Sequence, residues 1–176
     1  LPKDTQALLH TFKSSGAKSH VLAAAIKANQ HRRAALADRV VAAVGHTPDR
    51  VAVWGLTFKA GTDDVRDSPS IDLIQGLTRR GIDAVVYDPL VSDLPDDLDA
   101  KIAGSALEAA AGADAVVIAT EWPEFKEVDL NSAAAAMSGT TIVDLRNFLT
   151  SEAVNAAGLD HHPLGNLRSL AADYSR

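Results

Sequence analysis

Short runs of apolar residues, rich in valine and isoleucine, alternate with helical segments across most of this chain, and this alternation constrains its fold more than any other feature. The four runs are Arg50–Thr57, Ala84–Tyr87, Ala115–Thr120 and Thr141–Leu145. Runs that are nearly continuously apolar are typical of strands buried on both faces. Such strands, joined through helices, predict an α/β fold: a Rossmann-like parallel sheet with helices on both faces.

The segments between these runs carry helix signals. Ser68 is a good N-cap, Pro69 suits the first helical position, and Gly81 suits the residue that ends a helix. The two other predicted helices of this region are Ala106–Ala111 and Leu130–Met137.

The N-terminal part of the chain is expected to be helical. A short helix is predicted over 5–15, and Ser19–Val44 contains neither proline nor glycine, which predicts one unusually long helix of roughly 25 residues. A helix of this length is either a packed surface helix or a spine that links two domains or forms a dimer seam. The predicted units are therefore a helical linker or dimerisation segment (1–46), an α/β domain (47–167) and a tail (168–176).

Composition excludes several classes of function. The net charge of −6 argues against sequence-independent binding of nucleic acid. The chain has no cysteine, and its six histidines lack paired spacing, so neither a disulfide nor a metal site is expected. No apolar run approaches the ~18 residues of a membrane span. A soluble, cytoplasmic protein without a membrane partner is expected.

Two cations follow predicted strands, at the sheet edge where ligands of such folds bind. Lys59 follows the first strand and Arg146 the fourth, and a helix is predicted to begin beside them at Ser68. Cations beside a helix N-terminus favour a phosphate or diphosphate ligand. The alternative is that Lys59 and Arg146 pair with neighbouring carboxylates.

A dinucleotide fingerprint is absent from the turn after the first strand. Gly55 and Gly61 lie six residues apart, which does not fit G-x-G-x-x-G. Asp88, after the second strand, stands where a ribose-binding acid often lies, but Asp-Pro is equally a common turn.

The loop after the first strand carries the strongest motif. Phe58–Pro69 resembles the signature F-K-x-x-T-D-D-x-R-(E/D)-S-P of the UDP-glucose/GDP-mannose dehydrogenases. Leu1–Asp4 is similar to the segment after that family's nucleophilic cysteine, G-G-S-C-(F/L)-P-K-D. Further matches occur in the family's order, at Tyr87-Asp88-Pro89, Thr120-Glu121-Trp122 and Asp144-x-Arg146-Asn147. The resemblance extends from Leu1 to about Asn166.

The resemblance implies an enzyme of three parts: an NAD-binding domain, a long central helix and a C-terminal UDP-sugar-binding domain. This chain would hold the second and third parts, and the helix from Ser19 would form the core of a homodimer. The family oxidises a sugar C6 alcohol twice, with two NAD reduced, through intermediates held on a cysteine thiolate. For this chain the implied reaction is the oxidation of UDP-glucose to UDP-glucuronate.

The resemblance also implies roles for individual residues. Asp4 would be the catalytic acid or base that handles the attacking water. Lys3 and Arg66 would contact NAD. The residues that would bind the nucleotide sugar are Phe58, Lys59 and Arg146.

Two departures from the family pattern matter. The chain begins at the residue that would follow the cysteine, so it is expected not to turn over substrate alone. Leu145 stands where relatives commonly have glycine, which loosens the assignment of Arg146. UDP-glucose fits the motifs best. The alternatives are GDP-mannose as the substrate and a non-catalytic nucleotide-binding or dimerisation module.

Overall fold

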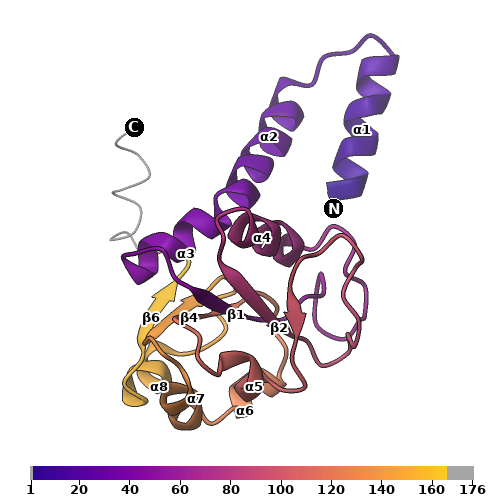
Figure 1. The fold of residues 1–176 in the computed structure, drawn as a ribbon. Coiled ribbons are helices and arrows are strands. Elements are labelled where there is room, and N and C mark those ends of the chain that lie inside the picture. The colour runs from indigo at the N-terminus through magenta and orange to yellow at the C-terminus, as the bar shows by residue number, and fades with distance from the viewer. Residues whose placement is uncertain (1, 166–176) are drawn as a thin grey trace.

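The sheet that the sequence predicts is present and is fully parallel. The structure is a computed structural model that describes residues 2–165; the tail predicted at 168–176 lies outside the described residues. Six parallel strands are arranged in the order β3-β2-β1-β4-β5-β6 (Figure 1). The strands are β1 (Arg50–Trp54), β2 (Asp83–Tyr87), β3 (Lys101–Ile102), β4 (Ala115–Ile118), β5 (Thr141–Asp144) and β6 (Asp160–Pro163).

Helices cover both faces of this sheet, which confirms the predicted Rossmann-like class. In β1, Val51 and Val53 point into one hydrophobic core, and Ala52 and Trp54 point into the other. The helices of the first face are α3 (Leu36–Val44) and α4 (Pro69–Thr78). Those of the second face are α5 (Ala106–Ala110), α6 (Glu124–Glu127), α7 (Leu130–Ala136) and α8 (Ser151–Ala156).

The single long helix predicted over Ser19–Val44 is wrong. The segment forms α2 (His20–Ala34) and then α3, with a break at Ala35, whose ψ of 1° is not helical. α3 buries Leu36 and its neighbours on the sheet, whereas α2 buries none of its residues. The chain therefore turns at Ala35 because α3 packs on the sheet, whereas α2 contacts α4 without burying any of its residues.

The helices α1 (Pro2–Ser14) and α2 form a hairpin that projects from the α/β domain (Figure 1). Val21 on α2 is 84% exposed. Arg33, near the base of the hairpin, donates to the carboxylate of Asp72 and to the Ser68 carbonyl oxygen at 3.2 Å, and so ties α2 to the start of α4. Among the residues that the structure describes, no helix is long and apolar enough to cross a membrane.

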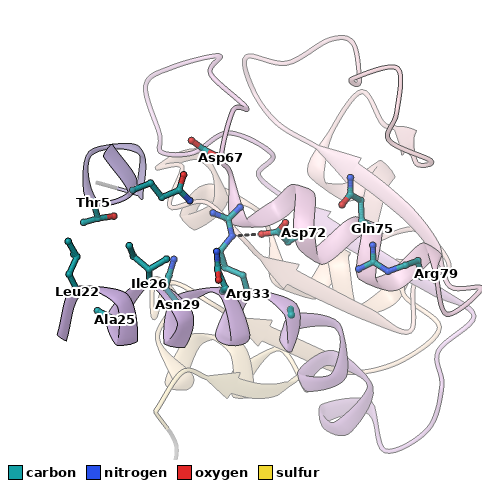
Figure 2. Close-up of a pocket in the computed structure, with 13 residues that line it drawn as sticks. Thr5, Leu22, Ala25, Ile26, Asn29, Arg33, Asp67, Asp72, Gln75 and Arg79 are labelled. Atoms are coloured by element: carbon teal, nitrogen blue, oxygen red, sulfur yellow. Dashed lines mark hydrogen bonds and ion pairs between the residues drawn. The ribbon is translucent and has the colours of Figure 1, made fainter. Parts of the chain in front are cut away.

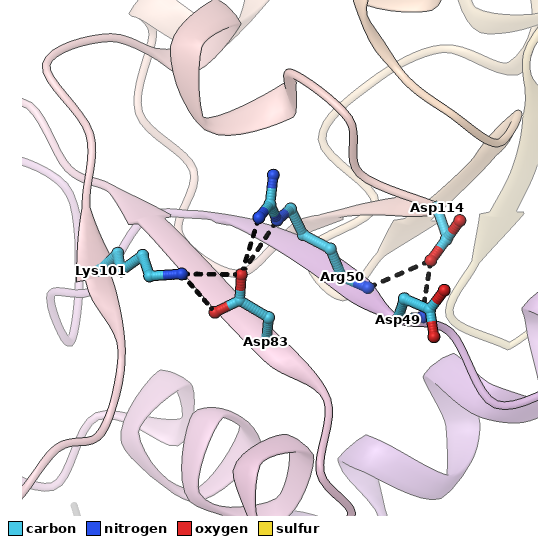
Figure 3. Close-up of polar contacts among 5 residues, drawn as sticks. All are labelled: Asp49, Arg50, Asp83, Lys101 and Asp114. Carbon is cyan, nitrogen blue, oxygen red and sulfur yellow. Dashed lines mark hydrogen bonds and ion pairs between the residues drawn. The ribbon is translucent and has the colours of Figure 1, made fainter.

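A polar cluster joins the starts of β1, β2 and β3, at the end of the sheet opposite to the carboxyl ends (Figure 3). The Arg50 Nε donates to Asp83 at 3.0 Å, and the Lys101 Nζ contacts both oxygens of the same carboxylate at 3.1 and 3.0 Å. Beside them, Asp114 accepts from the backbone N–H groups of Asp49 and Arg50 at 2.7 and 3.1 Å. These contacts fasten β1, β2 and β3 to one another.

Replacement of Asp83 with asparagine is expected to lower the free energy of unfolding at pH 7 by about 1 kcal/mol. The hydrogen bonds from Lys101 and then Arg50 lower the pKa of Asp83 below its ordinary value of 3.8. Because the folded-state pKa is lower than the unfolded one, the ionised carboxylate stabilises the fold above pH 3.8. That contribution is lost as the pH falls through the folded-state pKa, so the two proteins should converge there.

Urea unfolding of both proteins across this pH range measures the effect. Asp97→Asn is the matched control, because Asp97 is exposed and forms no ion pair with any other residue in 2–165. A loss of stability in Asp97→Asn as large as that in Asp83→Asn would contradict the role given to the cluster.

Candidate functional site

The carboxyl ends of β1 and β4 approach each other closely where β1 ends. Gly55 has φ of 98°, and a Cβ at this position would lie 2.4 Å from the Cβ of Thr120. The Thr120 hydroxyl donates to the Thr57 carbonyl oxygen at 2.7 Å. Only glycine fits this conformation and this contact, and the path of the loop after β1 depends on it.

Asp88 acts as a buried acceptor that joins three strand ends. Its Oδ2 accepts from the backbone N–H groups of Leu56 and Thr57 at 2.8 and 3.1 Å, and from the Thr57 hydroxyl at 3.0 Å. The same oxygen accepts from the Trp122 Nε1 at 3.0 Å, and Oδ1 accepts from the Leu90 N–H at 3.0 Å. Of the two readings that the sequence allowed, the structure therefore favours the turn over the ribose-binding acid.

The loop between β1 and α4 presents Phe58 and Lys59 to solvent. The backbone N–H of Phe58 donates to the Asp64 carbonyl oxygen at 2.9 Å, which closes the loop, and Phe58 is 39% exposed. Lys59 is exposed and forms no hydrogen bond or ion pair with any residue in 2–165. Its ammonium group is therefore available to an anion.

Arg66, in the same loop, is held by a neighbouring carboxylate. Its Nε and NH2 donate to the two oxygens of Asp64, both at 2.8 Å. The hydrogen bonds from the Arg66 side chain and backbone lower the pKa of Asp64 to about 2. The Arg66 side chain remains 87% exposed, so its orientation is restrained while its charge faces solvent.

The N-terminus of α4 lies at the end of this loop, as the sequence predicts. The Ser68 hydroxyl accepts from the Ser70 N–H at 3.2 Å, and Pro69 occupies the first helical position. The helix N-terminus contributes partial positive charge on the side of the domain that carries Lys59.

Arg146 follows β5 and is partly exposed. Its guanidinium contacts the carboxylate of Glu121, which follows β4, and its backbone N–H donates to Asp144 at 2.9 Å. The alternative of pairing with nearby carboxylates therefore holds for Arg146 and fails for Lys59. Two candidate substrate-binding cations thus lie at the carboxyl edge of one sheet: Arg146 is paired, and Lys59 has no partner among residues 2–165.

The helical hairpin places the start of α1 on the side of the domain that carries the β1–α4 loop. Asp4 is an exposed residue in the first turn of α1, and Lys3 precedes it in that helix. Thr5 and Gln6 line a groove of about 660 Å³ that is also lined by Asp67, next to Arg66 (Figure 2). The remaining groove residues belong to α2 and α4 and include Asn29, Arg33, Asp72, Gln75 and Arg79.

Sequence reasoning missed the side chains that hold the candidate residues in place. His161 on β6 lies beside the buried Asp144, and Glu121 accepts from Arg146. The Tyr87 hydroxyl donates to Glu124 at 2.6 Å; burial and then this contact raise the pKa of Tyr87 to about 12. These contacts join residues that lie far apart in the sequence, so no local spacing could have indicated them.

Comparison with known proteins indicates the family to which this domain is similar. A family model described as the UDP binding domain of the UDP-glucose/GDP-mannose dehydrogenase family matches residues 52–151. The matched stretch begins in β1, ends at the first residue of α8, and includes the whole β1–α4 loop and Arg146.

Curated relatives match almost the entire chain. A UDP-glucose 6-dehydrogenase of Rhizobium meliloti is 37% identical over 93% of this chain, and the UDP-glucose 6-dehydrogenase TuaD of Bacillus subtilis is 34% identical over 93%. The chain spans only 38% and 36% of the length of these two relatives.

Solved structures agree with the fold. A UDP-D-ManNAc dehydrogenase from Pyrococcus horikoshii has a TM-score of 0.75 and 32% identity, covering 94% of this chain and 37% of that one. A UDP-glucose dehydrogenase from Pyrobaculum islandicum has a TM-score of 0.70 over 92% of this chain and 36% of that one; at 24% identity it supports the fold alone.

Proposed function

This chain belongs to the UDP-glucose/GDP-mannose dehydrogenase family, and we propose that it is the UDP-sugar-binding part of an NAD-dependent UDP-glucose 6-dehydrogenase. The observation that carries the proposal is the coincidence of the matched UDP-binding domain with a free cation at the carboxyl edge of the sheet. Lys59 lies within the matched stretch and has no partner among residues 2–165. The names of the curated relatives favour UDP-glucose as the sugar nucleotide.

Three residues would hold the nucleotide sugar. The Lys59 ammonium and the Arg146 guanidinium would bind the diphosphate, whose negative charge suits the edge that carries both cations. Phe58, which is 39% exposed, would offer an apolar surface to the ligand. Phe58 and Lys59 are adjacent on the β1–α4 loop and would act together.

The proposed reaction of the intact protein is the oxidation of the C6 alcohol of UDP-glucose to the carboxylate of UDP-glucuronate. Two hydrides leave the substrate carbon, one water is consumed, and NAD supplies the hydride acceptor. The chain contains no cysteine, so a thiolate that carries the intermediates would come from outside it.

The residues of this chain suit a partial contact with NAD. Its β1–α4 turn lacks the glycine spacing that would cradle a dinucleotide, so NAD would bind mainly elsewhere. Arg66 keeps most of its side chain in solvent and would reach an anionic group of NAD, and Lys3 would lie against the same cofactor.

Asp4 would act as the acid or base for the attacking water. Its neighbours Thr5 and Gln6 line the groove that also reaches the β1–α4 loop, which supports a position near the reacting carbon. Normal turnover by an Asp4→Asn variant of the intact protein would refute that role.

The helical hairpin would form the core of a homodimer. α2 buries none of its residues in the monomer: Val21 is 84% exposed, and Leu22 and Ile26 are partly exposed. Apolar side chains left exposed on a projecting helix mark an interaction surface. Sedimentation of the chain as a monomer at every accessible concentration would refute this assembly.

Isothermal titration of the chain with UDP, UDP-glucose and GDP-mannose tests the proposed function. UDP and UDP-glucose are expected to bind with dissociation constants on the order of micromolar, and GDP-mannose at least ten times more weakly. Preference for GDP-mannose would replace the substrate. Failure of a folded sample to bind any of the three would indicate a non-catalytic module and overturn the proposal.

A further inference from the structure

The turn that carries Arg146 is held by a single buried carboxylate. Asp144 ends β5, and its side chain is fully buried. Its Oδ1 accepts from the backbone N–H of Arg146 at 2.9 Å, and its Oδ2 accepts from those of Phe148 and Leu149 at 2.7 and 2.8 Å. One side chain therefore satisfies three backbone donors of the five-residue segment that follows it.

This turn contains a left-handed residue whose position the carboxylate helps to fix. Asn147 lies between the bonded residues and has φ of 51°, in the left-handed region that asparagine tolerates better than most residues other than glycine. The three N–H groups bonded to Asp144 lie on both sides of Asn147.

A histidine on the neighbouring strand packs beside the carboxylate. The side chain of His161 on β6 is 3% exposed, and its Nε2 lies 3.5 Å from the Oδ2 of Asp144 but forms no hydrogen bond with any residue in 2–165. Its Nδ1 lies 2.8 Å from the Oγ of Ser151, at the start of α8. The imidazole therefore fills the space behind the Asp144 carboxylate and is itself held in orientation by Ser151.

The guanidinium of Arg146 is held separately from its backbone. Glu121 contacts the Nε and NH2 of Arg146, while Asp144 fixes the backbone of the same residue. At the far side of the turn, the Lys126 ammonium lies 4.3 Å from the centre of the Phe148 ring. The backbone and the guanidinium of Arg146 are thus both held in place before any ligand binds.

We propose that Asp144, supported by His161, is a positioning residue that preorganises Arg146 for the diphosphate of the bound UDP-sugar. This inference rests on the proposed function and assigns a role to two residues that do not touch the ligand. A long, flexible arginine loses conformational freedom on binding, and a turn fixed in advance reduces that loss. The geometry supplies such a turn at one of the two candidate cations.

A double-mutant cycle on UDP binding tests the inference. Isothermal titration would compare the wild-type chain with Asp144→Asn, Arg146→Ala and the double variant. Arg146→Ala is expected to weaken binding by roughly 10- to 100-fold, the range of charged hydrogen bonds. Asp144→Asn should weaken it about 10-fold, because an amide cannot accept all three N–H groups, and should add nothing in the Arg146→Ala background.

A second variant covers the case in which Asp144→Asn does not fold. His161→Phe keeps a ring of similar size and leaves the three N–H contacts of Asp144 in place. It is expected to weaken UDP binding about 3-fold, again only when Arg146 is present. Asp114→Asn is the matched control, because that carboxylate also accepts two backbone N–H groups but lies at the opposite edge of the sheet (Figure 3).

The outcomes separate the inference from the proposed function. Wild-type UDP affinity in every folded Asp144 and His161 variant would overturn the inference alone. So would an equal loss in the presence and absence of Arg146, or an equal loss in Asp114→Asn, because each indicates general destabilisation. Failure of the wild-type chain to bind UDP would overturn the proposed function, and this inference with it.

Discussion

Replacement of Lys59 with alanine is expected to weaken UDP binding by roughly 10- to 100-fold. Hydrogen bonds to charged groups contribute about 1.5–3 kcal/mol each, and every 1.4 kcal/mol corresponds to about tenfold in affinity. Lys59 is exposed and has no partner among residues 2–165, so its removal leaves no buried group unsatisfied. The loss should therefore appear in ligand affinity and not in the stability of the fold.

Isothermal titration with UDP measures the affinity, and urea unfolding measures the stability of the same samples. The salt dependence of binding should also fall, because a charge that faces the diphosphate has been removed. Lys13→Ala, at an exposed position in the last turn of α1, is the matched control. An unchanged affinity in Lys59→Ala would exclude Lys59 from the binding site.

Replacement of Gly55 with alanine is expected to lower the free energy of unfolding by about 4 kcal/mol. The left-handed conformation at φ of 98° costs an L-residue about 1–2 kcal/mol. A Cβ would also lie 2.4 Å from the Thr120 Cβ and 2.7 Å from the Thr120 backbone nitrogen. Relief of such an overlap in a packed core costs typically ~1–3 kcal/mol more.

Gly81→Ala separates these two contributions. Gly81 also has a positive φ, of 75°, but a Cβ there would meet no atom within 4 Å. Its replacement should cost only the conformational part, about 1 kcal/mol. Equal losses of stability in the two variants would contradict the close contact between the ends of β1 and β4.

The strands that the sequence predicts are those whose apolar composition reflects their burial. β1, β4 and β5 are rich in valine and isoleucine because each is buried on both faces, and β2, whose residues alternate between buried and partly buried, also contains two valines. β3 contains only Lys101 and Ile102, and β6 reads Asp-His-His-Pro. These edge strands form because the neighbouring strand provides backbone hydrogen-bond partners. Neither contains a run of apolar residues that would predict a strand.

The break at Ala35 lay beyond the reach of sequence reasoning for a different reason. Alanine favours helices, and the segment contains no proline or glycine. The helix ends there because Leu36 and Ala37 pack into the domain while α2 projects away from it. A break that depends on tertiary packing leaves no local signal.

The candidate site, too, could be predicted from the sequence only in part. Strand order places Lys59 and Arg146 at the carboxyl edge, and this follows from the predicted topology. Whether either cation is paired depends on side-chain directions across strands, as with Arg146 and Glu121. The buried role of Asp88 depends on the Trp122 Nε1, which approaches from a separate strand end.

The strand order also governs how the chain reaches its folded state. β1 lies between β2 and β4, and Val51 pairs with Ala115 in the parallel register. No two neighbouring strands form a hairpin, so every ladder must close over a distant segment, and such non-local pairing slows folding. During synthesis β1 emerges well before β4, and one side of this apolar strand stays without its neighbour until then. Folding speed, and with it exposure to aggregation, should therefore depend most on how soon β1 and β4 pair.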